Sequence, residues 1–237
     1  MRDYDVREAV RRHLALQHTN DTDTLIVEEM GVWSGSVRID VAVINGELCG
    51  YELKSDRDTL ERLPAQAELY SRVFDRVCLV VGSKHEGKAR RIIPRWWSVM
   101  TATMGPEGAR LRLVREGKSN PKPDPYLVAQ LLWKEEALAA LERLGLAKGW
   151  KSKGAAQIQQ RLATSVNFAE LSDIVRSALK SRAGWLGKPV SHQREMPVHA
   201  VDDPCRSTSR VHRPRSDLLD SPIPPTSGHA PEAWGAD

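Results

Sequence analysis

Apolar and polar residues alternate most regularly between residues 37 and 54. The stretches 37–44 and 48–54 each place an apolar residue at every second position, which predicts two β-strands. The Asn45-Gly46 pair between them is typical of a hairpin turn. Further apolar runs predict a strand beginning at 25–27, a buried strand at 76–82, and a second hairpin from strands at 98–103 and 110–115.

Helical spacing of apolar residues predicts the other elements of this half. Val6, Val10 and Leu14 lie on one stripe of a helix expected over residues 3–17. Pro64 suits the first turn of a helix reaching about residue 74, and a short helix is expected at 86–93. The order helix, strand, hairpin, helix, strand predicts an α/β sandwich.

The second half of the chain is expected to be helical. After a linker-like KSNPKPDP at 118–125, an amphipathic pattern predicts one helix over 126–144. Ser152 can cap a second helix, and Asn167 followed by Glu170 predicts a third that ends near Arg182. From residue 187 the composition predicts disorder. We therefore expect an α/β domain at 1–117, a helical module at 124–185 and a tail at 187–237.

Composition narrows the class of protein. The 237 residues are enough for a full core, and a net charge of +4 suits a polyanionic partner without identifying one. Three widely spaced cysteines argue against a disulfide framework or a zinc site and for a reducing cytoplasm. The charged N-terminus and the absence of a long apolar run predict neither a signal peptide nor a membrane span.

Three charged residues, Asp40, Glu52 and Lys54, interrupt the predicted hairpin. Charges in apolar strands are costly unless they are used. Glu52 and Lys54 are two residues apart and share a strand face. A two-residue turn would pair Asp40 with Tyr51 and point Glu52 to the opposite face.

A three-residue turn reverses this parity. If residues 44–46 form it, with Gly46 in the left-handed conformation, Asp40 lies across from Gly50 and diagonal to Glu52. Gly50 would then leave space between the carboxylates for a divalent cation. We expect this turn because it makes the opposite face uniformly apolar, with Ile39, Val41, Val43, Cys49, Tyr51 and Leu53.

The three side chains in one place predict phosphodiester chemistry. A divalent ion between Asp40 and Glu52 can polarise a phosphodiester and lower the pKa of a bound water. Lys54 can orient that water or stabilise the charge that develops. The alternative is a solvated ion pair on an exposed hairpin, since D…ExK is a short and common pattern.

The stretch YELKSDRDTLERLPAQAELY at 51–70 resembles a block found in an uncharacterised bacterial branch of the PD-(D/E)xK nuclease-like superfamily. The resemblance extends from the N-terminus to about residue 185 and is strongest over 27–82. It implies a restriction-endonuclease-like αβ sandwich with a mixed central sheet. It also implies a metal-dependent nuclease acting on DNA in repair, mobile-element or defence contexts.

The resemblance also implies roles for single residues. Asp40, Glu52 and the Leu53 carbonyl would bind Mg²⁺ or Mn²⁺, with Lys54 catalytic. Gln66 matches a helix residue that many members place near the phosphate, with Tyr70 one turn later as a nucleic-acid contact. The alternative for both is a helix surface with the tyrosine packed on the sheet. The remaining acidic candidates are Glu8, which we expect on a solvated face, Glu28 and Glu29.

Residues 138–163 are similar to a SAP-type helix–loop–helix, a small DNA-binding module. This likeness implies that Lys148, Lys151, Lys153 and Arg161 meet DNA phosphates. The alternative is a helical cap whose lysines face water.

Three function classes stay open. The first is the nuclease, and because many members of the superfamily work as dimers, it could be a homodimer. The second is a non-catalytic DNA-binding or regulatory protein on the same fold. The third is a protein whose tail or helical module binds another chain.

Overall fold

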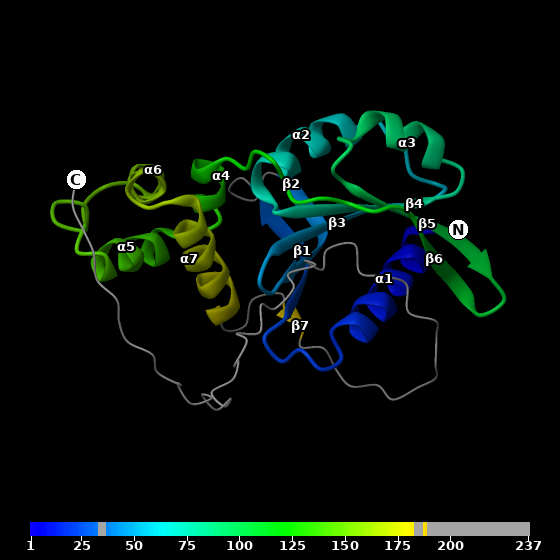
Figure 1. The fold of residues 1–237 in the computed structure, drawn as a ribbon, viewed down its shortest axis with the longest axis horizontal. Helices are drawn as coiled ribbons and strands as arrows, with labels where there is room; N and C mark the ends of the chain where they lie inside the picture. The colour runs from blue at the N-terminus through cyan, green and yellow to red at the C-terminus, as the bar shows by residue number, and fades with distance from the viewer. Residues whose placement is uncertain (33–36, 183–186, 189–237) are drawn as a thin grey trace, which may run out of the picture. The chain divides into compact units, whose positions relative to one another are not determined.

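The computed structural model describes residues 1–32, 37–182 and 187–188 (Figure 1). Contacts divide the chain into units Met1–Arg206 and Ser207–Asp237, and the second unit lies outside the described residues. The sandwich contains α1 (Asp3–Gln17), β1 (Leu25–Val32), β2 (Val37–Ile44), β3 (Leu48–Lys54), α2 (Leu63–Val73), β4 (Arg76–Gly82), α3 (Glu86–Ile92), β5 (Ser98–Gly105) and β6 (Gly108–Arg115). The helical part contains α4 (Pro125–Ala129), α5 (Lys134–Arg143), α6 (Ala155–Ser165) and α7 (Phe168–Ser181), and β7 (Gly187–Lys188) follows.

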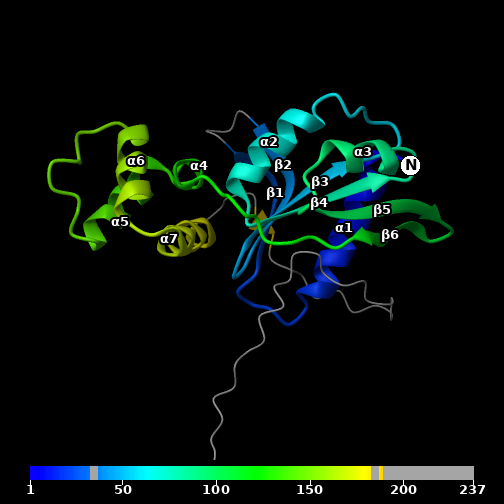
Figure 2. The ribbon, with the colours of Figure 1, turned by 45° about the horizontal axis from the view of Figure 1, so that its top comes forward.

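One mixed sheet organises the first half of the chain. Its strand order is β6-β5-β4-β3-β2-β1-β7, with β3, β4 and β5 parallel and the other neighbours antiparallel. Helix α1 covers one face, and α2 and α3 cover the other (Figure 2). The predicted α/β class and the mixed sheet are therefore confirmed.

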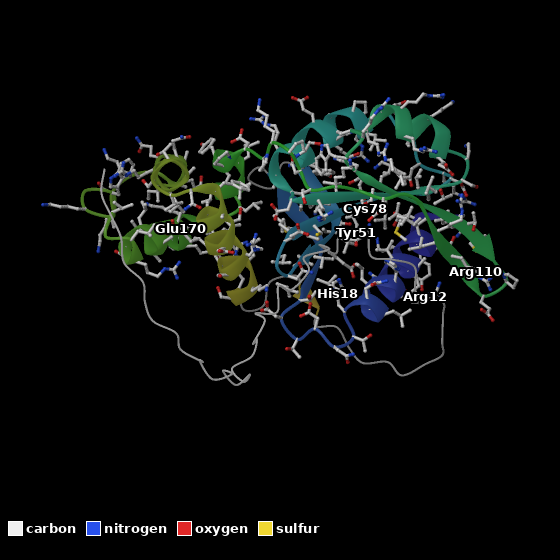
Figure 3. The ribbon with its side chains drawn as sticks, viewed as in Figure 1. Arg12, His18, Tyr51, Cys78, Arg110 and Glu170 are labelled. Atoms are coloured by element: carbon white, nitrogen blue, oxygen red, sulfur yellow. The ribbon has the colours of Figure 1, made fainter. Side chains whose placement is uncertain are left out.

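Two apolar clusters lie on the two faces of the sheet. On one face, the α1 stripe of Val6, Val10 and Leu14 packs in a cluster with Tyr51 and Cys78, which are neighbours across β3 and β4 (Figure 3). On the other face, the larger cluster joins α2 with buried residues of the helical part, including Leu127, Leu141, Ile158, Leu171 and Val175. The helical part is thus packed onto the α2 layer.

The prediction of one helix over 126–144 is wrong, because the helix is interrupted between the end of α4 at Ala129 and the start of α5 at Lys134. The break frees backbone carbonyls, and distant side chains satisfy them. Gln159 donates to the Leu132 carbonyl at 2.8 Å and Arg182 to the Leu131 carbonyl at 2.6 Å. Both donors come from elements far along the chain, so local periodicity carries no sign of the break.

Other boundaries of the helical part agree with the sequence in part. Asn167 caps α7 by accepting the Glu170 N–H at 3.0 Å, as predicted. Helix α6 is capped at Gly154 and not at Ser152. The tail expected at 187–237 lies outside the described residues, except that Gly187 and Lys188 pair with β1. In the described part of the chain, no helix combines the length and the hydropathy needed to cross a bilayer.

Candidate metal and phosphodiester site

The β2–β3 hairpin has the expected parity but a different register. Ile44 pairs with Leu48, so residues 45–47 form the three-residue loop, and Ala42 rather than Asp40 faces Gly50. Val41 pairs with Tyr51 at the far end of the paired region. The same register continued by one residue places Asp40 opposite Glu52. Among the described glycines only Gly108, Gly145 and Gly149 have positive φ, so the left-handed Gly46 is wrong. The Asn45 side chain instead accepts the Glu47 N–H at 3.0 Å.

Gly50 does not open a space between the carboxylates. A Cβ on this residue would lie 3.1 Å from Phe74 Cδ1 and 3.2 Å from Ile39 Cδ1. The aromatic ring and the isoleucine therefore fill the volume that the sequence assigned to a cation. A side chain at position 50 would force Phe74 or Ile39 to shift by a few tenths of an ångström.

The apolar face expected on the hairpin is also interrupted. Val41 and Val43 pack in the α1 layer, but Ile39 packs in the α2 layer. On β1, Val27 and Met30 share the α2 layer although they are three positions apart, a spacing that places residues of a regular strand on opposite faces. Both strands thus reverse their alternation at Glu29 and Asp40, and Glu29 has a φ of 54°. The left-handed region is unusual for a residue other than glycine, asparagine or aspartate and marks local strain.

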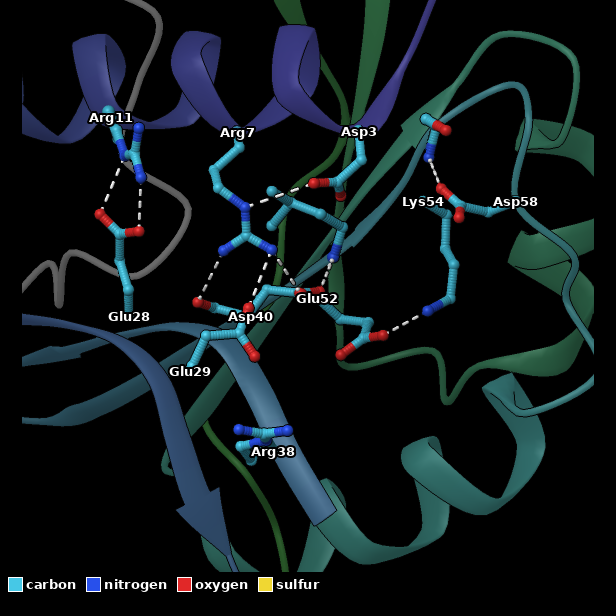
Figure 4. A network of polar contacts seen from close by, with 12 residues as sticks. Asp3, Arg7, Arg11, Glu28, Glu29, Arg38, Asp40, Glu52, Lys54 and Asp58 are labelled. Carbon is cyan, nitrogen blue, oxygen red and sulfur yellow. Dashed lines mark hydrogen bonds and ion pairs between the residues drawn. The ribbon is translucent and has the colours of Figure 1, made fainter. Parts of the chain in front are cut away.

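Asp40 lies at this reversal and is held from two sides. Its Oδ2 accepts the Leu53 N–H at 2.8 Å, and its Oδ1 accepts from Arg7 Nη2 at 2.9 Å (Figure 4). The same guanidinium group lies 3.0 Å from Glu29 Oε1 and 3.4 Å from Asp3 Oδ2. Burial raises the pKa of Asp40, although the Leu53 N–H and the Arg7 charge oppose the rise.

Glu52 and Lys54 form a buried pair on the α2 side. Their residues are 1% and 7% exposed, and Lys54 Nζ donates to Glu52 Oε1. The other carboxylate oxygen, Oε2, is buried and accepts no hydrogen bond, because the neighbouring Tyr70 hydroxyl donates to the Arg38 carbonyl. Burial raises the pKa of Glu52 to about 7; the nearby Asp40 charge adds to the rise and Lys54 opposes it. The Tyr70 hydroxyl also acts on the Glu52 carboxylate and opposes the rise of its pKa. Asp40, Glu52 and Lys54 therefore act on one another in one cluster.

Two residues of α2 face the cluster. Gln66 Oε1 is buried without a hydrogen-bond partner. Tyr70 is fully buried, its ring stacks on Trp97, and its hydroxyl donates to the Arg38 carbonyl at 2.7 Å. Burial and the Glu52 charge raise the pKa of Tyr70. Tyr70 packs on the sheet, as in the alternative interpretation, and its ring is not exposed to a nucleic acid in this conformation.

The donor set fits a hard divalent cation in part. Glu52 Oε2 and Gln66 Oε1 are buried oxygens without partners, and such oxygens are the ligands that Mg²⁺ and Mn²⁺ prefer. Asp40 is adjacent, but both of its oxygens already accept hydrogen bonds. The described residues contain no group of three or more His, Cys, Asp or Glu side chains arranged for a metal. A cation here would depend on the two carboxylates, a backbone carbonyl and water.

Sequence reasoning missed Arg7. Asp3, Arg7 and Arg11 follow one another at intervals of four along α1, next to the apolar stripe. Arg7 reaches Asp40 and Glu29, while Arg11 binds Glu28 with its Nε at 2.9 Å from Oε1. Their spacing was a signal, but it indicates a solvated face equally well. Glu8 is partly exposed beside Arg11, 3.7 Å away, in partial agreement with the solvated face expected for it.

The candidate DNA-binding residues of the SAP-like stretch differ in their exposure. Lys148, Lys151 and Lys153 are exposed in the loop between α5 and α6, where Lys151 pairs with Glu142 at 3.0 Å. Arg161 on α6 lies over the Trp150 ring at 5.7 Å. The lysines are thus accessible, whereas Arg161 takes part in packing.

Comparisons with known proteins place the chain in a family. Protein cII of Enterobacteria phage P4 is 24% identical over 161 residues, which cover 68% of this chain and 60% of that protein. The chain therefore matches less than two thirds of the length of this relative. No solved structure matches the chain. The family model described as Bacteriophage P4 protein cII matches residues 1–186, and the chain belongs to this family.

Proposed function

We propose that the protein is a metal-dependent nuclease that hydrolyses DNA phosphodiester bonds on a restriction-endonuclease-like sandwich. The observation that carries the proposal is the unpartnered, buried Oε2 of Glu52 beside Asp40 and Lys54. A buried carboxylate oxygen without a donor costs free energy, which a bound cation would recover. The mixed sheet with helices on both faces is compatible with the proposed fold.

The residues divide the work as follows. Asp40, Glu52 and the Leu53 carbonyl would hold Mg²⁺ or Mn²⁺, which supplies Lewis-acid polarisation and a bound water of lowered pKa. Lys54, oriented by Glu52, donates to the oxygen that gains charge during attack on the phosphorus. Gln66 offers its free carbonyl oxygen to the attacking water.

Arg7 sets a condition on this mechanism. Its guanidinium group already neutralises Asp40 at Oδ1. Asp40 can ligate a cation through that oxygen only when Arg7 moves toward its other partners, Glu29 and Asp3. The relation to a phage protein supports the mobile-element context among the three considered.

Cleavage of supercoiled plasmid and duplex oligonucleotides with Mg²⁺ or Mn²⁺ tests the proposal. We expect Lys54→Ala and Asp40→Ala to lower the rate by at least about 100-fold. Lys122→Ala, which removes an exposed lysine of the linker, should cleave like the wild type. Because Lys54 is buried, the nearly isosteric Glu52→Gln serves as a parallel variant that keeps the packing. Cleavage that survives all three site substitutions rejects the nuclease.

A second function, non-catalytic DNA binding or regulation, is favoured by one observation. The chain's own groups already satisfy both oxygens of Asp40 and one oxygen of Glu52. Titration calorimetry of Mg²⁺ and Mn²⁺ into wild type and Glu52→Gln separates the two functions. Heat that disappears in the variant supports the nuclease. Salt-sensitive DNA binding without heat or cleavage supports the second function.

A further inference from the structure

An open groove of about 490 Å³ lies on the α3 side of the sandwich, away from the residues proposed for catalysis. Its lining consists of Gly87 and four arginines, Arg90, Arg91, Arg95 and Arg115. Arg90 and Arg91 end α3, Arg95 lies in the following turn, and Arg115 ends β6. We call this feature the arginine groove.

The positive charge of the arginine groove is only slightly compensated. Arg90 lies 3.4 Å from Glu86. Within residues 1–32 and 37–182, no carboxylate lies within 4 Å of Arg91, Arg95 or Arg115. Burial lowers the pKa of Arg115, and the charges of Arg90 and Arg95 lower it further. Holding these cations together costs free energy, which an anion from outside the chain would offset.

One wall of the groove is preorganised. Arg115 Nε donates to the Trp97 carbonyl at 2.9 Å, and Nη2 donates to the Pro94 carbonyl at 2.9 Å. These bonds fix the guanidinium plane and leave the other N–H groups free to donate. At Gly87 an added Cβ would meet nothing within 4 Å, so this side of the groove is open. Arg91 and Arg95 are exposed and can adjust to the ligand.

We propose that the arginine groove binds the sugar-phosphate backbone of DNA. Guanidinium groups recognise phosphate oxygens by paired hydrogen bonds, and several of them along an open groove suit a chain of phosphates better than a single small anion. The proposal rests on the proposed function in taking DNA as the ligand. It concerns binding, and it assigns no role in cleavage to these arginines.

Fluorescence anisotropy of a labelled duplex with the full-length protein in EDTA measures this binding without hydrolysis. We expect Arg91→Gln and Arg95→Gln each to raise Kd about 3- to 10-fold at moderate salt. Each should also reduce the slope of log K against log salt by about 1. Lys122→Gln removes one positive charge from the exposed linker, outside both the groove and the SAP-like stretch, and should leave the slope nearly unchanged.

The outcomes separate this proposal from the nuclease. Groove variants that bind with the slope and Kd of Lys122→Gln overturn the arginine groove, even if the protein cleaves plasmid. Weakened binding by the groove variants supports the groove, even if no cleavage occurs. Tighter binding of RNA than of duplex DNA of equal length overturns DNA as the ligand.

Discussion

The Asp40–Glu52 cluster and the arginine groove both bring like charges together. They differ in how the repulsion between these charges is offset. In the cluster the acids are largely buried, and each has its own cation, Arg7 or Lys54. In the groove three of the four arginines are exposed, and Glu86 is the one carboxylate among the described residues paired with its lining. Burial therefore enforces compensation within the chain, whereas exposure lets water screen the charges and keeps them available to a ligand.

The largest effect should follow from Lys54→Met. This change leaves Glu52 buried without its cation, so we expect the free energy of unfolding to fall by about 3 kcal/mol. Urea denaturation at pH 8 measures the loss. The double variant Glu52→Gln/Lys54→Met removes both charges and should recover most of it. A single variant as stable as the wild type would show that the cluster does not depend on its internal pairing.

A smaller effect should follow from Arg7→Gln. The Arg7 side chain is 15% exposed and forms ion pairs with Asp40, Glu29 and Asp3. Its loss should therefore lower the free energy of unfolding by about 1.5 kcal/mol. Arg11→Gln is the matched control on the same helix. Its side chain is 37% exposed, and the expected loss is below about 1 kcal/mol. Equal losses, measured in parallel urea titrations, would mean that burial does not set the value of these pairs.

The smallest effect on stability should come from the arginine groove. Arg91→Gln and Arg95→Gln should change the free energy of unfolding by no more than about 0.5 kcal/mol, because both side chains are exposed. Any change should be a gain, greatest at low salt, where repulsion between the arginines is least screened. A loss above about 1 kcal/mol would indicate that these residues hold α3 in place.

Local patterns in the sequence were sufficient to predict the boundaries of most strands in the sheet. The strands Val37–Ile44, Leu48–Lys54 and Arg76–Gly82 begin and end where the alternation and the apolar run predicted. The parity of the hairpin was also predictable, because a wrong parity would turn an apolar face to the site. The register was not, because contacts from a distant segment act on the hairpin: Phe74 lies against Gly50, and Asp75 accepts the Leu48 N–H at 2.7 Å.

In the candidate site, too, local patterns did not predict the contacts made by distant parts of the chain. The sequence alone indicated that Asp40, Glu52 and Lys54 come together, since they lie on one hairpin. It did not indicate Arg7, because an arginine beside an apolar stripe looks the same whether it faces water or a neighbouring strand. Only the placement of α1 over the end of β2 distinguishes the two. The break before α5 likewise depends on Arg182 and Gln159, which lie far along the chain.

The reversal at Glu29 and Asp40 ties both layers of helices to a single point of backbone. On either side of it, the same strand supplies Ile39 to the layer under α2 and Val41 to the layer under α1. Because Asp40 lies between these two residues, we expect a displacement of either helix to act on its position. We therefore expect cavity-forming substitutions in either layer, such as Val10→Ala under α1 or Phe74→Ala beside Gly50, to change the spacing of the acid pair.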